Sequence, residues 1–237
     1  MLVLIRWCNS RKKAAESFLK TRDKLDILVN NAGVINANWG QTKRDKIEIH
    51  FAVNHVGPFI FTTTILPALN PGSRIVNVTS FAQDIPKPPD FIRFDRLDDP
   101  NAWPNWLAWY GQSKFCNVVF TVELQRRLGD RAYVNCCHPG QVATELLERS
   151  VKDYGFTGYM DKLITSKLLD QPVETGALTQ LYLATSEEIV DKNIRAEYYL
   201  PIAQRSTKEL MNPGALNEDL GKRLWTFTED LVREKLK

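Results

Sequence analysis

A tyrosine and a lysine four residues apart offer the sharpest chemistry in the sequence, in the run Tyr110-Gly-Gln-Ser-Lys114. Residues i and i+4 share one face of a helix, so the two side chains would lie together. An ammonium beside a phenol favours the phenolate and lowers the phenol's pKa from its ordinary value of about 10. Such a pair can exchange a proton with an alcohol or a carbonyl. The spacing alone is a weak signal, and the alternative is a surface helix that carries both residues by chance.

Further polar residues fall where strands are predicted to end. Asn30-Asn-Ala-Gly33 closes one apolar run, Ser80 follows a second, and Pro139-Gly140 follows a third. Ligands of open α/β sheets lie beyond the carboxyl ends of the strands, so these residues would meet at one cleft. Asn54 lies in an apolar helical segment, where it either holds backbone or water or is a hydrogen-bonded core amide.

The elements that must position these residues alternate along the chain. Short apolar runs rich in β-branched and aromatic residues predict strands at residues 25–30, 74–79, 132–137 and 196–201. Helical spacing predicts helices at 42–69 (interrupted near Gly57 and Pro58), 106–128, 172–185 and 218–236. This alternation predicts an α/β fold, a Rossmann-like doubly wound parallel sheet in a single domain over residues 1–237.

Two long segments without a clear period, 81–103 and 140–169, follow strand ends and are predicted to line the cleft. Three tryptophans lie near the first of them, and they either line a substrate pocket or pack the loop onto the next helix: Trp103, Trp106 and Trp109.

Composition excludes several classes of protein. The 237 residues are 43% hydrophobic and 25% charged, which is ordinary for a globular protein and excludes wholesale disorder. A net charge of +3 argues against nucleic-acid partners. The sequence contains no stretch of about 18 uncharged apolar residues, so no membrane span is predicted. The four cysteines form no C-x-x-C pair, which favours reduced thiols and a cytoplasmic location. The histidines, at His50, His55 and His138, do not form a metal set, and no metal site is expected.

Taken together, these motifs resemble the short-chain dehydrogenase/reductase family, in the family's order and from about Ala14 onward. The chain looks closest to fungal members related to retinol dehydrogenases, judged by residues 94–100 and 175–178. The resemblance implies an NAD(P)-dependent oxidoreductase that interconverts an alcohol and a carbonyl. Retinoid-like, steroid-like and secondary-metabolism substrates all remain open.

The resemblance also implies a role for each matching residue. Tyr110 would be the general acid/base, and Lys114 would lower its pKa and bind the nicotinamide ribose. Ser80 would orient the substrate oxygen, and Asn54 would hold a water that links Lys114 to solvent. The residues that would contact the cofactor, NADP slightly ahead of NAD, are Asn31, Ala32, Gly33, Tyr110, Lys114, Pro139, Gly140, Val142 and Thr144.

One family feature is missing, because the sequence contains no Gly-rich T-G-x-x-x-G-x-G turn. That turn places the cofactor pyrophosphate on a helix N-terminus, so its absence predicts impaired cofactor binding. The chain is interpreted as N-terminally truncated, without the family's first two βα units, which leaves strand 25–30 as an apolar sheet edge. Leu2-Val-Leu-Ile5 is a candidate replacement strand. The basic stretch 6–13 is interpreted as a mis-spliced join in an incomplete gene model.

Alternatives to an active enzyme follow from the same residues. One is a truncated, inactive relative that acts as an interaction protein. A serine hydrolase is disfavoured, because Gly111-Gln-Ser-Lys-Phe115 lies within a helix and is not a nucleophile elbow. The resemblance implies a homodimer through helices 42–69 and 106–128. Four aromatic residues either form its contacts or face the chain's own sheet: Phe51, Phe59, Phe61 and Phe120.

Overall fold

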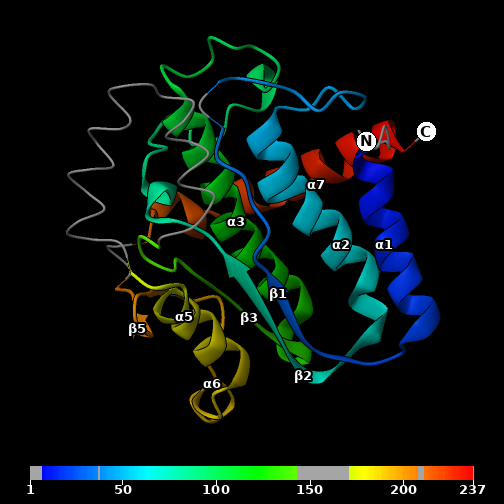
Figure 1. Cartoon of the computed structure of the whole chain (residues 1–237), viewed down its shortest axis with the longest axis vertical. Helices are drawn as coiled ribbons and strands as arrows, with labels where there is room; N and C mark the ends of the chain where they lie inside the picture. Colours follow the sequence, from blue (N-terminus) through cyan, green and yellow to red (C-terminus); the bar gives the residue numbers. More distant parts are fainter. Residues whose placement is uncertain (1–6, 37, 143–170, 208–210, 237) are drawn as a thin grey trace.

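A computed structural model of the chain describes residues 7–36, 38–142, 171–207 and 211–236, and shows a parallel sheet with helices on both faces (Figure 1). Neighbouring strands follow the chain order, and only the last pair is antiparallel. The strands are β1 (Leu25–Asn30), β2 (Leu69–Val78), β3 (Ala132–Cys137), β4 (Tyr198–Leu200) and β5 (Gln204–Arg205). The doubly wound α/β fold predicted from the sequence is confirmed.

Helices connect the strands and close the chain. They are α1 (Trp7–Thr21), α2 (Gly57–Ile65), α3 (Trp106–Leu128), α5 (Val173–Thr185), α6 (Glu188–Asp191) and α7 (Glu218–Lys235). A π-helical segment, Phe51–Val56, runs directly into α2. No helix among the described residues is long and apolar enough to cross a membrane.

Consecutive residues of a strand pack on opposite faces of the sheet. Ile75 of β2 packs into a cluster with side chains of α1, α2, α3 and α7. The next residue, Val76, packs with side chains of α5 and α6 on the opposite face. This alternation follows from the period of two in a strand. In Figure 1 the same division is visible, with α5 and α6 on one side of the strands and α1 and α2 on the other.

The helix predicted at 42–69 differs from the structure at both ends. Thr42 and Ile47 close a turn through backbone and side-chain hydrogen bonds, so the helical residues begin only at Ile49. The helix then continues through Gly57 and Pro58. Pro58 is the second residue of α2 and follows directly on the π-helical segment, where the Gly57 N–H bonds to the Ala52 carbonyl five residues back. After Ile65, three residues of 3-10 helix lead straight into β2, which begins at Leu69 and not at residue 74.

Helix α1 was not predicted from the sequence. The basic stretch interpreted as a faulty join is regular helix from Trp7 onward, and its charges at 11–13 lie on an exposed face. Ala15 is fully buried on the other face. The proposed strand Leu2-Val-Leu-Ile5 lies outside the described residues.

The phenylalanines proposed as dimer contacts lie largely in the chain's own core. Phe51, Phe59 and Phe120 are at most 3% exposed, and Phe61 is partly buried against the same core. Trp225 of α7 covers two of them, with ring centroids 4.9 Å from Phe59 and 5.9 Å from Phe120. Phe51, Phe59 and Phe120 are therefore unavailable to a second copy, and the homodimer itself stays a prediction.

Among the described strands, β1 lies at the edge of the sheet. Within the described residues it pairs with β2 alone. Leu28 faces the α2 layer and is buried, whereas Ile27 and Val29 on the other face are 41% and 39% exposed. The four cysteines are free and buried: Cys8, Cys116, Cys136 and Cys137.

Candidate active site at the carboxyl edge of the sheet

The end of β2 and helix α3 are joined by two hydrogen bonds. Thr79 Oγ1 donates to the Lys114 carbonyl at 2.8 Å, and Lys114 Nζ donates to the Val78 carbonyl at 3.1 Å. Lys114 itself is 5% exposed. The two bonds hold the Tyr110–Lys114 stretch of the helix against the strand end that Ser80 follows.

Ser80 and Tyr110 are brought together where a loop crosses α3. The 3-10 turn Phe81–Asp84 lies so close to Gly111 that a Cβ there would be 2.8 Å from the Ala82 carbonyl oxygen. Ser80 Oγ accepts from the Ala82 N–H at 3.2 Å, and Ser80 lies near enough to the Tyr110 side chain to affect its pKa. The structure therefore brings three of the four predicted catalytic side chains to one edge of the sheet.

Burial dominates the titration of both Tyr110 and Lys114. It raises the pKa of Tyr110 to about 12, with the nearby Ser80 acting in the opposite direction. It lowers the pKa of Lys114 to about 8, against a smaller opposing effect of Cys137. The lowering of the Tyr110 pKa by Lys114 stays a prediction, because burial is the largest effect on this phenol. The ammonium lies 5.8 Å from the centre of the phenol ring, and desolvation of the phenolate outweighs its attraction.

Asn54 joins three parts of the site from the π-helical segment. Its Oδ1 accepts from the Val34 N–H at 2.7 Å, and its Nδ2 donates to the Val34 carbonyl at 3.1 Å. Nδ2 also donates to Ser113 Oγ at 2.9 Å, and Ser113 Oγ donates to the Tyr110 carbonyl at 2.7 Å. Both amide hydrogens of Asn54 are thus used on protein groups. The water-holding role stays a prediction.

The loop after β1 fits a ligand that approaches the backbone closely. A Cβ on Gly33 would lie 3.2 Å from Asn54 Oδ1 and 3.3 Å from Lys114 Nζ, so a side chain there would fill the space beside both groups. Asn31 and Ala32 are exposed. A flat nicotinamide or ribose group beside Lys114 is compatible with this cradle.

The second predicted cofactor segment follows β3. Gly140 has φ +85°, a conformation that favours glycine, and a Cβ there would meet Pro201 at 3.2 Å. Val142 packs so tightly on Gly176 of α5 that a Cβ at Gly176 would lie 2.4 Å from its side chain. Pro139 lies between His138 and Gly140, and Thr144 lies outside the described residues.

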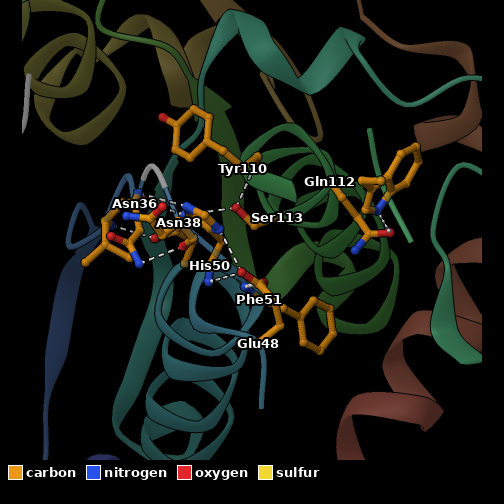
Figure 2. Close-up of polar contacts among 11 residues, drawn as sticks. Asn36, Asn38, Glu48, His50, Phe51, Tyr110, Gln112 and Ser113 are labelled. Atoms are coloured by element: carbon orange, nitrogen blue, oxygen red, sulfur yellow. Dashed lines mark hydrogen bonds and ion pairs between the residues drawn. The ribbon is translucent and has the colours of Figure 1, made fainter. Parts of the chain in front are cut away.

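Two buried residues beside the site were not predicted to take part in it. Figure 2 shows His50 between Glu48 and Asn36, next to Tyr110 and Ser113. The sequence indicated of His50 only that it is not part of a set of metal ligands. The available signal was the acidic residue Glu48 directly before an apolar helical segment, the usual place for a helix-capping acid.

The tryptophans pack the 81–103 loop onto α3. Trp109 is 2% exposed in the core, and Trp103 Nε1 donates to Gln112 Oε1 at 3.3 Å, with the Arg93 guanidinium 4.1 Å above its ring. These contacts favour packing over pocket lining for both. Among the described residues, no group of three or more histidines, cysteines or acids could hold a metal.

Comparison with known proteins places this arrangement in a family. The family model for short chain dehydrogenases matches residues 5–89. Human retinol dehydrogenase 13 is 35% identical over 94% of this chain, which spans 65% of that protein's length. A short-chain dehydrogenase/reductase of Armillaria gallica is 32% identical over 93% of this chain and 69% of its own length.

A solved structure has the same fold. The short chain dehydrogenase of Burkholderia cenocepacia, in complex with NADP, superposes with a TM-score of 0.58 at 20% identity, covering 83% of this chain and 72% of that one. The fold, the sequence relatives and the order of the motifs agree. The chain belongs to the short-chain dehydrogenase/reductase family.

Proposed function

We propose that the chain is an NAD(P)-dependent oxidoreductase that interconverts a small-molecule alcohol and its carbonyl, with Tyr110 as general acid/base. The observation that carries the proposal is that Ser80, Tyr110 and Lys114 lie together at the carboxyl edge of the sheet, with Lys114 Nζ 5.8 Å from the centre of the Tyr110 ring. Gly33, whose missing side chain leaves its backbone close to Asn54 and Lys114, supports a cofactor site at that edge.

The protonation states suit reduction of a carbonyl at neutral pH. A phenol whose pKa is about 12 keeps its proton and can donate it to the substrate oxygen. The Ser80 hydroxyl would bind and orient the same oxygen. Lys114, still charged below its pKa of about 8, would stabilise the phenolate that the proton transfer leaves.

The nicotinamide, when bound, supplies the hydride or accepts it. The chain's own part is to hold and orient the cofactor. Residues proposed to do so are Asn31, Ala32, Gly33, Tyr110, Lys114, Pro139, Gly140, Val142 and Thr144. NADP is proposed ahead of NAD on the family resemblance alone. A cytoplasmic location, a homodimer and a role in secondary metabolism remain predictions from the sequence.

The test combines cofactor binding with one conservative variant. Thermal-shift titration of the 237-residue chain with NADPH and NADH should give a saturable rise in stability with one of them. Tyr110→Phe should retain that rise and lose about 10²–10⁴-fold in turnover of carbonyl substrates, since it lacks only the proton donor. Turnover that survives the substitution would show that the proposed role of Tyr110 is wrong.

A further inference from the structure

A buried carboxylate and imidazole lie beside the candidate site without a role in the proposed chemistry. Glu48 and His50 are each 1% exposed. His50 Nδ1 lies 2.7 Å from Glu48 Oε1, and the opposite nitrogen, Nε2, accepts from the backbone N–H of Asn36 at 2.9 Å. The His50 ring meets Tyr110 edge to face, with centroids 6.0 Å apart (Figure 2).

These partners fix the tautomer of His50. The backbone N–H of Asn36 can only donate, so Nε2 carries no proton and the neutral ring is protonated on Nδ1. Nδ1 then donates to Glu48 Oε1. Glu48 also accepts from the N–H groups of His50 at 2.9 Å and Phe51 at 2.7 Å, which fixes its carboxylate at the start of the helical segment. Glu48 therefore holds the imidazole in the form that can bind Asn36.

Asn36 lies three residues beyond Gly33, on the stretch that carries the proposed cofactor residues Asn31 to Gly33. Asn54 binds the same loop at Val34, through both its N–H and its carbonyl. Residues 50 and 54 are four apart on one helical segment, so a single helix face holds the loop at two points.

We propose that His50, oriented by Glu48, is a positioning residue that clamps the 31–36 loop and thereby sets the affinity for the nicotinamide cofactor. The inference rests on the proposed function, because the loop matters to catalysis only if it binds that cofactor. A loop that is ordered before the ligand arrives loses less conformational entropy on binding.

Two variants of His50 separate the clamp from general packing. His50→Gln places an amide oxygen near the position of Nε2, where it can accept from the Asn36 N–H. In His50→Asn the shorter side-chain amide lies near the position of Nδ1. It therefore keeps a donor for Glu48 and leaves the Asn36 N–H without an acceptor. Both variants lose the ring and its contact with Tyr110, and they differ in the bond to Asn36.

In His50→Asn we expect the Kd and the KM for NADPH, or for NADH if that is the cofactor bound, to rise about tenfold, as the loss of one hydrogen bond predicts. The kcat should change little. His50→Gln should restore most of the affinity. Hydrogen exchange at the Asn36 amide should become faster in His50→Asn and stay near the wild-type rate in His50→Gln.

Equal losses of affinity in the two variants, or a fall in kcat at unchanged cofactor KM, would overturn the proposal. If the wild-type chain binds neither NADPH nor NADH, the proposed function fails, and the clamp is still judged by the Asn36 exchange rates. ¹⁵N NMR of histidine-labelled wild-type chain adds a test that needs no variant. A His50 protonated on Nε2 would contradict the clamp outright.

Discussion

The proposed chemistry needs a protonated Tyr110 and a charged Lys114. Keeping the charged lysine buried destabilises the folded chain. The Lys114 ammonium is buried and donates to one backbone carbonyl, at Val78, while its pKa falls to about 8. A desolvated cation is costly in the folded state, and such costs are typical of functional sites. The buried phenol of Tyr110 bears no such cost, because it is neutral at physiological pH.

Lys114→Met should therefore stabilise the fold while it abolishes turnover. At neutral pH the gain should be on the order of 3 kcal/mol, which a pKa lowered from 10.5 to about 8 implies. In the wild type, the unfolded chain binds more protons than the folded chain between pH 8 and 10.5, so wild-type stability rises over that window. Denaturant unfolding at several pH values should show that the difference in free energy of unfolding between Lys114→Met and the wild type becomes smaller as the pH rises. A difference that widens would refute this interpretation.

The residue types of the site could be predicted from the sequence, and their environments could not. The spacing of Tyr110 and Lys114 and the strand-end position of Ser80 are local patterns. The direction of the Tyr110 pKa shift depends on burial by segments far along the chain, which no local pattern records. The same holds for His50, whose partner Asn36 belongs to another loop.

At the scale of elements, the first and last residues of α3 were predicted correctly, because both ends of the helix have clear local signals. Asn105 caps its first turn by accepting from the Ala108 N–H at 3.0 Å, and Gly129 ends it with φ +55°. Helix α1 was missed because its buried face is short and its exposed face is densely basic. The turn at 42–47 was missed because its polar residues are also compatible with the first turns of a helix.

The close approach between α3 and the turn after Ser80 makes Gly111 a sensitive position. Gly111→Ala would place a methyl group 2.8 Å from the Ala82 carbonyl oxygen, so the turn must shift away from α3. We expect a loss of about 1–3 kcal/mol in stability and a fall in kcat from the displaced Ser80.

Gly221→Ala in α7 is the matched control, because its new Cβ would meet only ordinary contacts, the nearest at 3.4 Å from Glu123. Urea unfolding and steady-state kinetics on both variants would check the prediction. Equal stability and equal kcat of the two variants would show that the contact between the 81–84 turn and α3 is not tight in solution.

At the scale of the whole molecule, α7 lies over the helix layer formed by α2 and α3. Trp225 packs on Phe59 and Phe120, and the Arg127 guanidinium lies 4.0 Å from its ring. His55, fully buried, contacts Thr228 of α7 at 3.0 Å, and burial lowers its pKa to about 3. The C-terminal helix thus completes the core on the face where the sequence resemblance implied a second subunit.

Trp225→Ala should destabilise the fold by about 3–5 kcal/mol, as expected for a large buried aromatic residue. Trp225→Phe should lose much less, because a ring still packs on Phe120. Neither substitution should alter the cofactor KM below the unfolding temperature, since Phe120 is ten residues beyond Tyr110 on α3. A changed KM in the folded variant would show that α7 also shapes the site.

The four buried cysteines can report unfolding of the chain, because they react only when they become exposed. Burial raises the pKa of Cys8 and of Cys136 to about 12, and raises those of Cys116 and Cys137 as well, so few reactive thiolates exist at neutral pH. A thiol-directed alkylating reagent should therefore react through transient opening, and mass spectrometry should show species with zero or four adducts. Saturating cofactor should slow this labelling. The chain could then be screened for its ligand without a known substrate.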